Sequence, residues 1–540
     1  MPDVLLIQPP IRDFYLTAKR TIPYGLSCIA SSLIKEGISV EIFDGLATAK
    51  SRIIEMPVEM AFLKNYYEGP DISPFSLFYH FRHFGYSFEH IGNIAKKSNA
   101  FLIGISSLFT PYWPEVLKTA EEIKKRVPSC QIVIGGHHPT ENSAMVMESE
   151  FIDFILRGEG EVSMPLLYRA LQGQFQLERV PGIVYRKADG SLQIEPPAIM
   201  GRLDAYPPPA EHLIKHKFYQ RKGKGSMVVM TSRGCPMKCT YCSIGGSSYL
   251  KYRRRDVSCI LDEIANGVEQ YDLGFVDFED ENLSLNRKWF LSLLQGISER
   301  FGEKNLELRA MNGLYTPSLD EEMISEMQRA GFQTLNLSLC TLSKRMLDQY
   351  QRKDIRDVFE QVLGYAQKTG MDAVGYIIVG GPNQCAVESV DDLLYLATHN
   401  VIAGVSVYYP APGSIEYDRC GKLGILPKSW TLMRSTAIPV SHTTSRIESL
   451  TLLRLGRILN FIKSLDRSPT GKTEIPSNSN QRAFDISDKR DLGISLVKDF
   501  LSDGKIRGVY PDGKLFEHKV SKKLTQRFIQ GLTKLDVDFK

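Results

Sequence analysis

Three cysteines stand close together in the segment GCPMKCTYCSI, residues 234–244. They are Cys235, Cys239 and Cys242. Thiolates at such a spacing bind soft metals, either a zinc ion or an iron–sulfur cluster. A tetrahedral metal site takes four ligands, and this loop supplies three of them. The sequence therefore raises the question of what fills the fourth position.

A structural zinc site is the weaker interpretation of this loop. Such sites usually combine two Cys-x-x-Cys pairs, and here one Cys-x3-Cys-x2-Cys stands alone with no histidine following in the loop. Cys259 is a distant candidate, but on a predicted helix it projects away from the apolar face, as an ordinary thiol would. A bacterial ferredoxin pattern fails because its spacing differs and Pro236 follows the first cysteine. What remains is a four-iron cluster in which the three cysteines bind three irons and the fourth iron has no protein ligand.

The elements that must position these cysteines belong to a βα series that begins with SMVVMTSRG, residues 226–234. Further strands are predicted near 275–278, 306–310, 334–339, 372–379 and 404–409. Helical patterns fill the gaps; the first has an apolar stripe of Val257, Ile260, Leu261, Ile264 and Val268. Six such strands predict a partial (β/α)6 barrel, whose chemistry lies at the carboxyl ends of the strands, where the cysteines are.

A separate α/β domain is predicted over residues 1–200. Its strands are expected at 4–7, 40–43, 101–106, 131–136 and 151–156, with helices at 24–36 and 114–126. Strands that are apolar on both faces predict a parallel, Rossmann-like sheet covered by helices on both sides. An aromatic-rich insert at 50–95 is interpreted as helices or a lid. Residues 182–197 predict a hairpin around Asp189-Gly190.

The rest of the chain completes a plan of two large domains and a smaller region, as its 540 residues and 43% apolar content allow. We predict a Pro-rich linker at 201–222, the barrel at 223–420 and a mostly helical region at 421–540. That last region contains an amphipathic helix at 449–465, a polar linker at 466–482 and a small α+β tail.

Composition excludes several classes of protein. The 66 basic and 62 acidic residues nearly balance at +4, and the basic ones are scattered, so no nucleic-acid partner is expected. The densest basic group, Lys251 with Arg253 to Arg255, is interpreted as solvated surface. No run of 18 apolar residues and no basic leader occurs, so we expect a cytoplasmic protein with no membrane partner. Nine cysteines predict reduced thiols rather than disulfides.

The segment RGCPMKCTYCSI resembles the radical S-adenosylmethionine (SAM) enzymes, including the aromatic Tyr241 before the last cysteine. The resemblance implies a [4Fe-4S] cluster on Cys235, Cys239 and Cys242, with SAM chelating the open iron. Reductive cleavage of SAM would give methionine and a 5'-deoxyadenosyl radical, which removes hydrogen from an unactivated carbon. It also implies an electron donor such as flavodoxin or ferredoxin.

Three further segments resemble the SAM-binding strands of that family. In FEDENLSLN (278–286), Asp280 and Glu281 are candidates to hold the SAM ammonium group, with a solvated loop as the alternative. In 335–354, Arg352 fits a family pattern, but Cys340 stands where relatives carry a glutamate, which leaves the ribose and amino-acid contacts open. In 375–382, glycines would let the strand approach the adenine. The implied SAM contacts are Tyr241, Asp280, Glu281, Ser338, Arg352 and Gly380.

The N-terminal domain is similar to the cobalamin-binding domain that precedes one class of radical SAM enzymes. The resemblance rests on IQPP, residues 22–44, SSL, GGHHPT and ILRGEGE, and on the 27 positions from Leu108 to Gly135. Small residues at these strand ends would leave a slot for the nucleotide tail of the cofactor. The implied contacts are Pro10, Gly25, Ser106, Leu108, Gly135, Gly136, Gly158 and Glu159.

One half of the cobalamin fingerprint is missing. The string Asp-x-His-x-x-Gly does not occur, so cobalt would take no imidazole from that loop. His137 and His138 are interpreted as loop hydrogen-bonders rather than as cobalt ligands. The GEGE segment at 158–161 is expected to cap the following helix, with one glutamate as a candidate cofactor contact. A Rossmann-like domain that serves only as a scaffold is the alternative.

Together these features predict a cobalamin-dependent radical SAM enzyme, most simply a methyltransferase for an unactivated carbon of a small molecule or peptide. In that class, methylcobalamin, recharged by a second SAM, donates the methyl group. Rearrangement, cyclisation, ring contraction and oxidation are alternatives, with or without cobalamin. An iron–sulfur or cobalamin carrier or sensor is the non-enzymatic alternative, and a zinc module is weaker still. The insert at 50–95 and the region beyond 420 are predicted to shape the substrate pocket.

Overall fold

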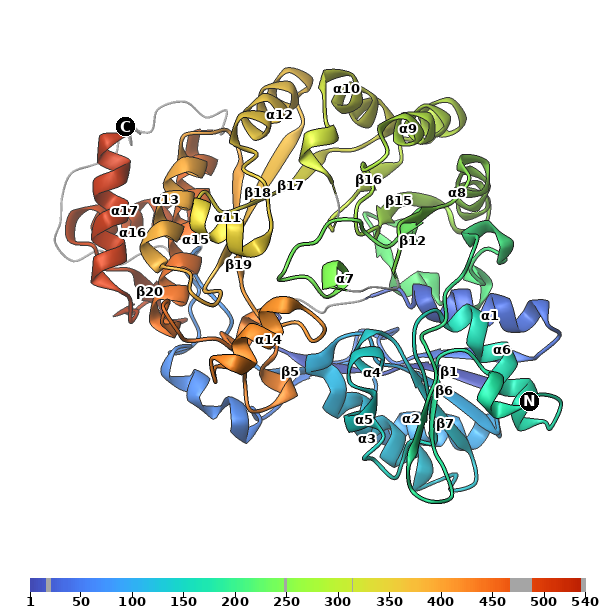
Figure 1. The fold of residues 1–540 in the computed structure, drawn as a ribbon. Helices are drawn as coiled ribbons and strands as arrows, with labels where there is room; N and C mark the ends of the chain where they lie inside the picture. The colour runs from blue at the N-terminus through green and yellow to red at the C-terminus, as the bar shows by residue number, and fades with distance from the viewer. Residues whose placement is uncertain (16–20, 247–249, 313, 467–487, 536–540) are drawn as a thin grey trace.

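The computed structural model describes residues 1–540 except 16–20, 247–249, 313, 467–487 and 536–540. An N-terminal sheet domain lies against a larger barrel-like domain, and the C-terminal helices lie beside the barrel (Figure 1). The predicted order of a Rossmann-like domain and a partial barrel is confirmed. The predicted polar linker falls outside the described residues, except for the end of helix α15.

The N-terminal sheet has seven strands in the order β10-β9-β8-β7-β6-β1-β3. Five are mutually parallel: β1 (Val4–Gln8), β3 (Val40–Asp44), β6 (Leu102–Ser106), β7 (Gln131–Gly135) and β8 (Phe154–Leu156). The predicted hairpin forms β9 (Ile183–Arg186) and β10 (Leu192–Ile194) at one edge. Because the five parallel strands share one direction, their carboxyl ends form one edge of the domain.

Helices cover both faces of this sheet because its strands are apolar on both sides. Val4 and Leu6 pack with α1 (Tyr24–Lys35) and α6 (Gly160–Leu171). Leu5 and Ile7, which alternate with them, pack with α2 (Phe88–Ser98) and α3 (Trp113–Lys124). Alternate side chains of a strand point to opposite faces, so a continuous apolar run produces two separate cores.

The six strands expected for the barrel are present in the described residues as two parallel groups. The first contains β12 (Lys224–Val229), β15 (Leu273–Phe278) and β16 (Glu307–Arg309), with β11 (Gln220–Arg221) antiparallel at its edge. The second contains β17 (Thr334–Cys340), β18 (Asp372–Val379) and β19 (Ile402–Val407). A single parallel bridge, Leu308 to Phe332, links the β16 region to the chain before β17. The barrel is therefore open, as a partial barrel requires.

Helices cover the outside of the barrel strands. They are α8 (Val257–Tyr271), α9 (Arg287–Phe301), α10 (Glu321–Ala330), α12 (Arg356–Thr369) and α13 (Ala386–Ala397). The predicted stripe of α8 faces the core: Ile260 and Ile264 are fully buried, and its other members pack against the same core. The 3.6-residue period therefore gave the correct face of this helix.

The aromatic insert contains the helices predicted for it, but also two strands that were not predicted. The helices are the 3-10 helix η1 (Val58–Asn65) and the first part of α2 (Phe88–Ser98). The strands are β4 (Ser51–Ile53) and β5 (Arg82–Phe84), and β5 pairs with both β4 and β2 (Ile11–Asp13). Phe75 is buried against Phe461 of the C-terminal region, and Asp71 accepts hydrogen bonds from Val509 N and His518. Its apolar side chains thus join the barrel core.

The C-terminal region completes that core. Its elements are α14 (Ile415–Lys422), α15 (Arg446–Asp466), α16 (Lys489–Asp503), β20 (Arg507–Val509), β21 (Leu515–Glu517) and α17 (Lys522–Lys534). Leu455 and Ile458 of α15 and Phe528 of α17 are fully buried there. The predicted α+β tail is confirmed. No helix in the described part of the chain is long and apolar enough to cross a membrane.

Candidate functional site

The tricysteine loop follows β12, at the carboxyl end of the first barrel strand. A short antiparallel ladder between β13 (Ser232–Arg233) and β14 (Arg253–Arg254) closes the loop at its base. Gly234 has φ +81°, and a Cβ there would lie 2.5 Å from the carbonyl oxygen of Lys251. Only glycine fits such a position, so the entry to the loop is a fixed turn.

The three cysteines carry free thiols in a partly buried environment. Cys239 is buried, and Cys235 and Cys242 are half-buried. Burial raises the pKa of Cys235 and of Cys242, and the neighbouring Cys239 adds to both shifts. No three His, Cys, Asp or Glu side chains of the described residues are grouped tightly enough to hold a single metal ion.

These thiols fit a cationic iron–sulfur centre. Neighbouring buried thiols oppose one another's ionisation, and a bound cationic centre offsets that repulsion and draws off their protons. Asn282 lies beside the first ligand, with its Nδ2 3.9 Å from the Sγ of Cys235. A donor near a ligating sulfur is the kind of neighbour that tunes such clusters.

Asp280 and Glu281 hold the chain as it enters the loop. The Asp280 carboxylate is fully buried and accepts hydrogen bonds from Thr231 N at 3.1 Å, Thr231 Oγ1 at 2.7 Å and Ser232 Oγ at 2.6 Å. Glu281 Oε2 accepts from Gly234 N at 3.1 Å. Asp280 is therefore no solvated loop residue, and its oxygens are engaged by the loop rather than directed toward a ligand.

Four residues of the predicted SAM region meet beside Cys239. Arg352 directs Nη1 at the Sγ of Cys239, 3.7 Å away, and donates from Nη2 to the Ser338 carbonyl at 3.3 Å. Cys340 and Tyr241 belong to the same apolar group. Cys340 has φ +71° at a register shift in β17, a conformation that a side chain adopts only when its surroundings impose it.

Arg352 brings a positive charge to the predicted cluster ligands. Burial alone would lower its pKa, but the nearby Tyr241, Cys239 and Cys340 raise the pKa above its usual value. The guanidinium is thus held in its charged form next to the sulfur of a predicted ligand. A cation there stabilises the reduced, more negative state of a cluster.

We expect the substitution Arg352→Met to lower the midpoint potential of the cluster by an amount on the order of tens of millivolts. Redox titration followed by electron paramagnetic resonance (EPR) measures this directly. Arg356→Met is the matched control, because Arg356 pairs with Asp354 on the exposed surface. An unchanged potential in Arg352→Met would contradict the role inferred from the 3.7 Å contact.

Gly380 lies at a close packing point after β18. It has φ +76°, and a Cβ there would lie 2.8 Å from the Oγ of Ser449 in α15. A Cβ on the adjacent Gly381 would lie 2.0 Å from the hydroxyl of Tyr350, whose ring contacts Tyr241 at 5.2 Å between centroids. The glycines therefore let this strand end pack on α15 and on Tyr350, and the adenine contact stays a prediction.

The predicted cobalamin residues of β6 and β7 meet at the carboxyl edge of the N-terminal sheet. Ser107 N donates to the Gly135 carbonyl at 2.8 Å. A Cβ on Gly136, which has φ +123°, would lie 2.4 Å from the Ser107 carbonyl oxygen. Leu108 is 44% exposed at this edge. The two loops therefore touch through glycine backbone at this edge, and the slot for the nucleotide tail stays a prediction.

The other predicted cobalamin residues have mixed surroundings. Gly25 is exposed, with no atom within 4 Å of a Cβ placed on it. Pro10 is buried beside Gly45. Gly158 has φ +82° and packs on Ala198, and the carboxylate of Glu159 is engaged by two arginines. Gly25 is therefore open to a ligand, whereas Pro10 and Glu159 face other parts of the protein.

The two histidines after the Gly136 turn differ in environment. His138 is buried, its Nδ1 lies 3.2 Å from Thr110 Oγ1, and burial lowers its pKa to about 4. His137 is exposed to water, yet burial among surrounding groups lowers its pKa too. His138 is therefore held inside the loop beside Thr110, whereas His137 is open to solvent.

Tyr409 follows β19, at the carboxyl end of the last barrel strand. It is 43% exposed, and burial, with contributions from Cys242 and Tyr15, raises its pKa. The sequence predicted a strand end here but did not single out Tyr409. It also missed Arg233, and its interpretation of Arg253 and Arg255 as solvated surface was wrong, because their side chains are only 14% and 12% exposed and both are ion-paired. Arg233 directly precedes Gly234, which is the one signal that could have marked it.

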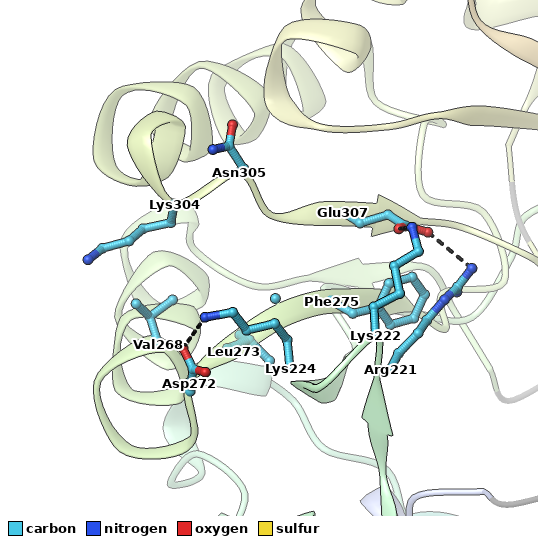
Figure 2. A pocket seen from close by; sticks show the side chains of 11 residues that line it. Arg221, Lys222, Lys224, Val268, Asp272, Leu273, Phe275, Lys304, Asn305 and Glu307 are labelled. Carbon is cyan, nitrogen blue, oxygen red and sulfur yellow. Dashed lines mark hydrogen bonds and ion pairs between the residues drawn. The ribbon is translucent and has the colours of Figure 1, made fainter.

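A pocket of about 440 Å³ lies elsewhere on the barrel. Figure 2 shows Lys222 and Lys224 at its rim, paired with Glu307 and Asp272. It opens at the beginnings of β15 and β16. Chemistry in α/β barrels occurs at the opposite, carboxyl ends of the strands, so this pocket is not the candidate site.

Comparison with known proteins agrees with this geometry. Residues 229–394 match the family model of the radical SAM superfamily, and residues 17–167 match that of the B12 binding domain. Cytidylyl-2-hydroxyethylphosphonate methyltransferase of Streptomyces wedmorensis is 26% identical over 80% of this chain and 84% of its own. Anaerobic magnesium-protoporphyrin IX monomethyl ester cyclase of Rubrivivax gelatinosus is 28% identical over 59% of this chain and 58% of its own.

Solved structures share the fold. The cobalamin-dependent SAM radical enzyme OxsB, with aqua-cobalamin and SAM bound, has a TM-score of 0.63 at 15% identity and covers 92% of this chain and 71% of its own. The radical SAM methyltransferase TsrM of Kitasatospora setae, with cobalamin and a [4Fe-4S] cluster bound, has a TM-score of 0.59 at 15% identity. The match covers 78% of this chain and 75% of the TsrM chain. The chain therefore carries a B12-binding domain ahead of a radical SAM domain.

Proposed function

We propose that this protein is a cobalamin-dependent radical SAM methyltransferase that methylates an unactivated carbon of a small molecule or peptide. The observation that carries this proposal is the presence of both domains in one chain. Three of the relatives found are methyltransferases by name, one of them for cytidylyl-2-hydroxyethylphosphonate.

A reduced [4Fe-4S] cluster with bound SAM supplies the organic radical that removes a hydrogen atom, and cobalamin supplies the methyl group. The chain's own residues prepare that site. Cys235, Cys239 and Cys242 would hold the cluster. Arg352 adds a cation beside Cys239, and Asp280 anchors the backbone before the loop.

The experiment combines reconstitution with a labelled methyl group. The anaerobically purified protein is loaded with iron, sulfide and hydroxocobalamin, and corrin absorbance should co-elute at about one equivalent. It is then incubated with dithionite, methyl viologen, methyl-labelled SAM and cytidylyl-2-hydroxyethylphosphonate, the acceptor named for one relative, alongside a small-molecule extract. We expect 5'-deoxyadenosine together with label in a carbon-methylated product.

Each other outcome favours a named alternative. 5'-Deoxyadenosine without transferred label would favour rearrangement, cyclisation or oxidation, the last two being compatible with the cyclase relatives. A cluster that never cleaves SAM would favour a carrier or sensor. A reconstituted protein that contains zinc and no sulfide would exclude every function based on an iron–sulfur cluster.

We further propose that an acidic electron carrier of the flavodoxin or ferredoxin type docks beside the tricysteine loop. Lys238 lies within the loop, and Lys251 and Arg254 flank it. All three are exposed, and none forms an ion pair with a described residue. Unpaired cations next to a redox centre attract an anionic partner and shorten the electron path to the cluster.

We expect K238E/K251E/R254E to slow cluster reduction by a reduced flavodoxin by roughly tenfold or more at low salt. Stopped-flow absorbance measures the rate. Reduction by the methyl viologen cation should not slow, because it needs no docking surface. The control K96E/K97E/K187E makes the same change of charge on the N-terminal domain and should behave as wild type. Equal slowing in both triple variants would disprove the docking surface.

A further inference from the structure

A buried ion network joins the B12-binding domain to the base of the tricysteine loop. Its members are Glu159, Glu161, Arg233 and Arg253, and their side chains are between 6% and 19% exposed. Glu159 Oε1 lies 3.2 Å from Arg233 Nη1, and Glu159 Oε2 lies 2.8 Å from Arg253 Nη1. Glu161 pairs with Arg233. We call these four residues the Glu159 network.

The backbone on both sides presents these side chains to one another. Gly158 packs on Ala198, where a Cβ would lie 2.3 Å from the carbonyl oxygen, and so fixes the turn that carries Glu159. Arg233 and Arg253 are directly opposed in the β13–β14 ladder. Opposed residues of an antiparallel pair share one face, so both guanidinium groups reach the same carboxylate.

The charges of the network depend on one another. Two arginines side by side repel, and burial strengthens that repulsion unless carboxylates lie between them. Burial alone would raise the pKa of Glu159, but Arg253, Arg233 and the amide of Met200 lower it below its usual value. Removing one carboxylate would leave an uncompensated buried cation at the start of the loop.

The network also lies between the two cofactor regions. Arg233 is two residues before Cys235, and the intervening Gly234 is held by Glu281. Glu159 follows β8, at the sheet edge where Gly135 and Gly136 lie. These contacts form a continuous path from that edge through Arg233 to the backbone beside the first cysteine.

We propose that Glu159 and Glu161 are positioning residues that set the place of Cys235 through Arg233 and thereby couple the cobalamin site to the iron–sulfur site. This inference rests on the proposed binding of both cofactors. It gives the GEGE segment a different role from the direct cofactor contact predicted for Glu159. Because coupling between binding sites is reciprocal, cobalamin should change SAM affinity by the same factor as SAM changes cobalamin affinity.

The test compares Glu159→Gln, which keeps the shape and removes the charge, with the wild-type holoprotein. We expect full iron content but a shifted EPR spectrum and midpoint potential of the reduced cluster. Saturating cobalamin should change the SAM dissociation constant by about fivefold or more in wild type and by less than about twofold in the variant. Glu161→Gln, which removes one partner of Arg233, should give smaller shifts in the same direction.

The matched control is Asp13→Asn. Asp13 and Arg434 form another buried ion pair, 3.2 Å from Nη1 to Oδ2, between the N-terminal region and the segment after the barrel. Tyr112 and Thr436 also bond the Asp13 carboxylate, and none of these partners belongs to the tricysteine loop. This variant should lose thermal stability while its EPR spectrum, potential and cobalamin coupling remain those of wild type.

Two results would overturn the inference. The first is that both glutamate variants keep the EPR spectrum, the midpoint potential and the cobalamin effect on SAM affinity of the wild type. The second is that Asp13→Asn shifts the EPR spectrum as Glu159→Gln does. If Glu159→Gln does not fold, Glu161→Gln and Glu159→Asp provide the comparison. A wild-type protein that retains no corrin and cleaves no SAM would instead disprove the proposed function. In that case the EPR spectrum of the cluster, compared between wild type and the glutamate variants, still tests the positioning of Cys235.

Discussion

Replacing Cys235, Cys239 and Cys242 together by alanine is expected to abolish reductive cleavage of SAM, by more than about a thousandfold. The three thiols are the grouped cysteines of the loop, so their loss removes every predicted anchor of the cluster. Chromatographic measurement of 5'-deoxyadenosine and methionine under dithionite gives the activity. Iron and sulfide analysis of the same sample should show that the cluster is missing, which ties the lost activity to the lost centre.

Cys259→Ala is the matched control for this experiment. Cys259 is a half-buried thiol on α8, outside the tricysteine loop, and the sequence predicts an ordinary thiol there. Its loss should leave iron content and SAM cleavage at wild-type levels. Persistent SAM cleavage in the triple variant would remove the basis of the proposed function, as would a spectrum showing protein ligands on all four irons.

Asp280→Ala is expected to lower the free energy of unfolding by about 3 kcal/mol and to reduce the iron content after reconstitution. The fully buried carboxylate accepts from the amide and hydroxyl of Thr231 and from the hydroxyl of Ser232. Removing the carboxylate leaves these buried donors with neither a hydrogen-bond partner nor water. They lie directly before the loop that carries the cysteines. Chemical denaturation measures the stability, and iron analysis measures the loading.

This experiment separates two roles for Asp280. If the residue anchors the loop, stability and iron content fall together, even without SAM. If it binds the SAM ammonium group, as the family resemblance implies, SAM affinity falls while the stability of the SAM-free protein stays near wild type. Asp262→Ala is the control, because Asp262 forms an exposed pair with Arg300 whose loss should change stability by less than about 1 kcal/mol.

Local pattern was sufficient for the elements that carry the site. The strand β1 and the stripe of α8 lie where apolar periodicity predicts them. The spacing of Cys235, Cys239 and Cys242 along the chain is itself a local property. Periodicity reports which face of an element is buried, and a loop motif reports which groups a few bonds apart can share a centre.

The insert shows where local pattern fails. Its segment around Arg82–Phe84 forms a strand because it pairs with Ile11–Asp13, some seventy positions away in the chain. Phe75 is buried because Phe461 of α15, hundreds of positions later, packs against it. Neither partner is visible from the insert, so its two strands were not predicted.

The sequence by itself determined the two-domain plan, the grouping of the three candidate cysteine ligands and the glycine turns at the carboxyl edge of the N-terminal sheet, because each depends on residues close together in the chain. Only the tertiary structure decided the partners of the buried charges. Asp280 bonds residues 48 and 49 positions away, and Glu159 bonds an arginine 94 positions away. A carboxylate in a sequence is the same whether it will bind a cofactor, anchor a loop or pair with a buried arginine. The donors that folding brings to it, and the water that folding removes, decide among these roles.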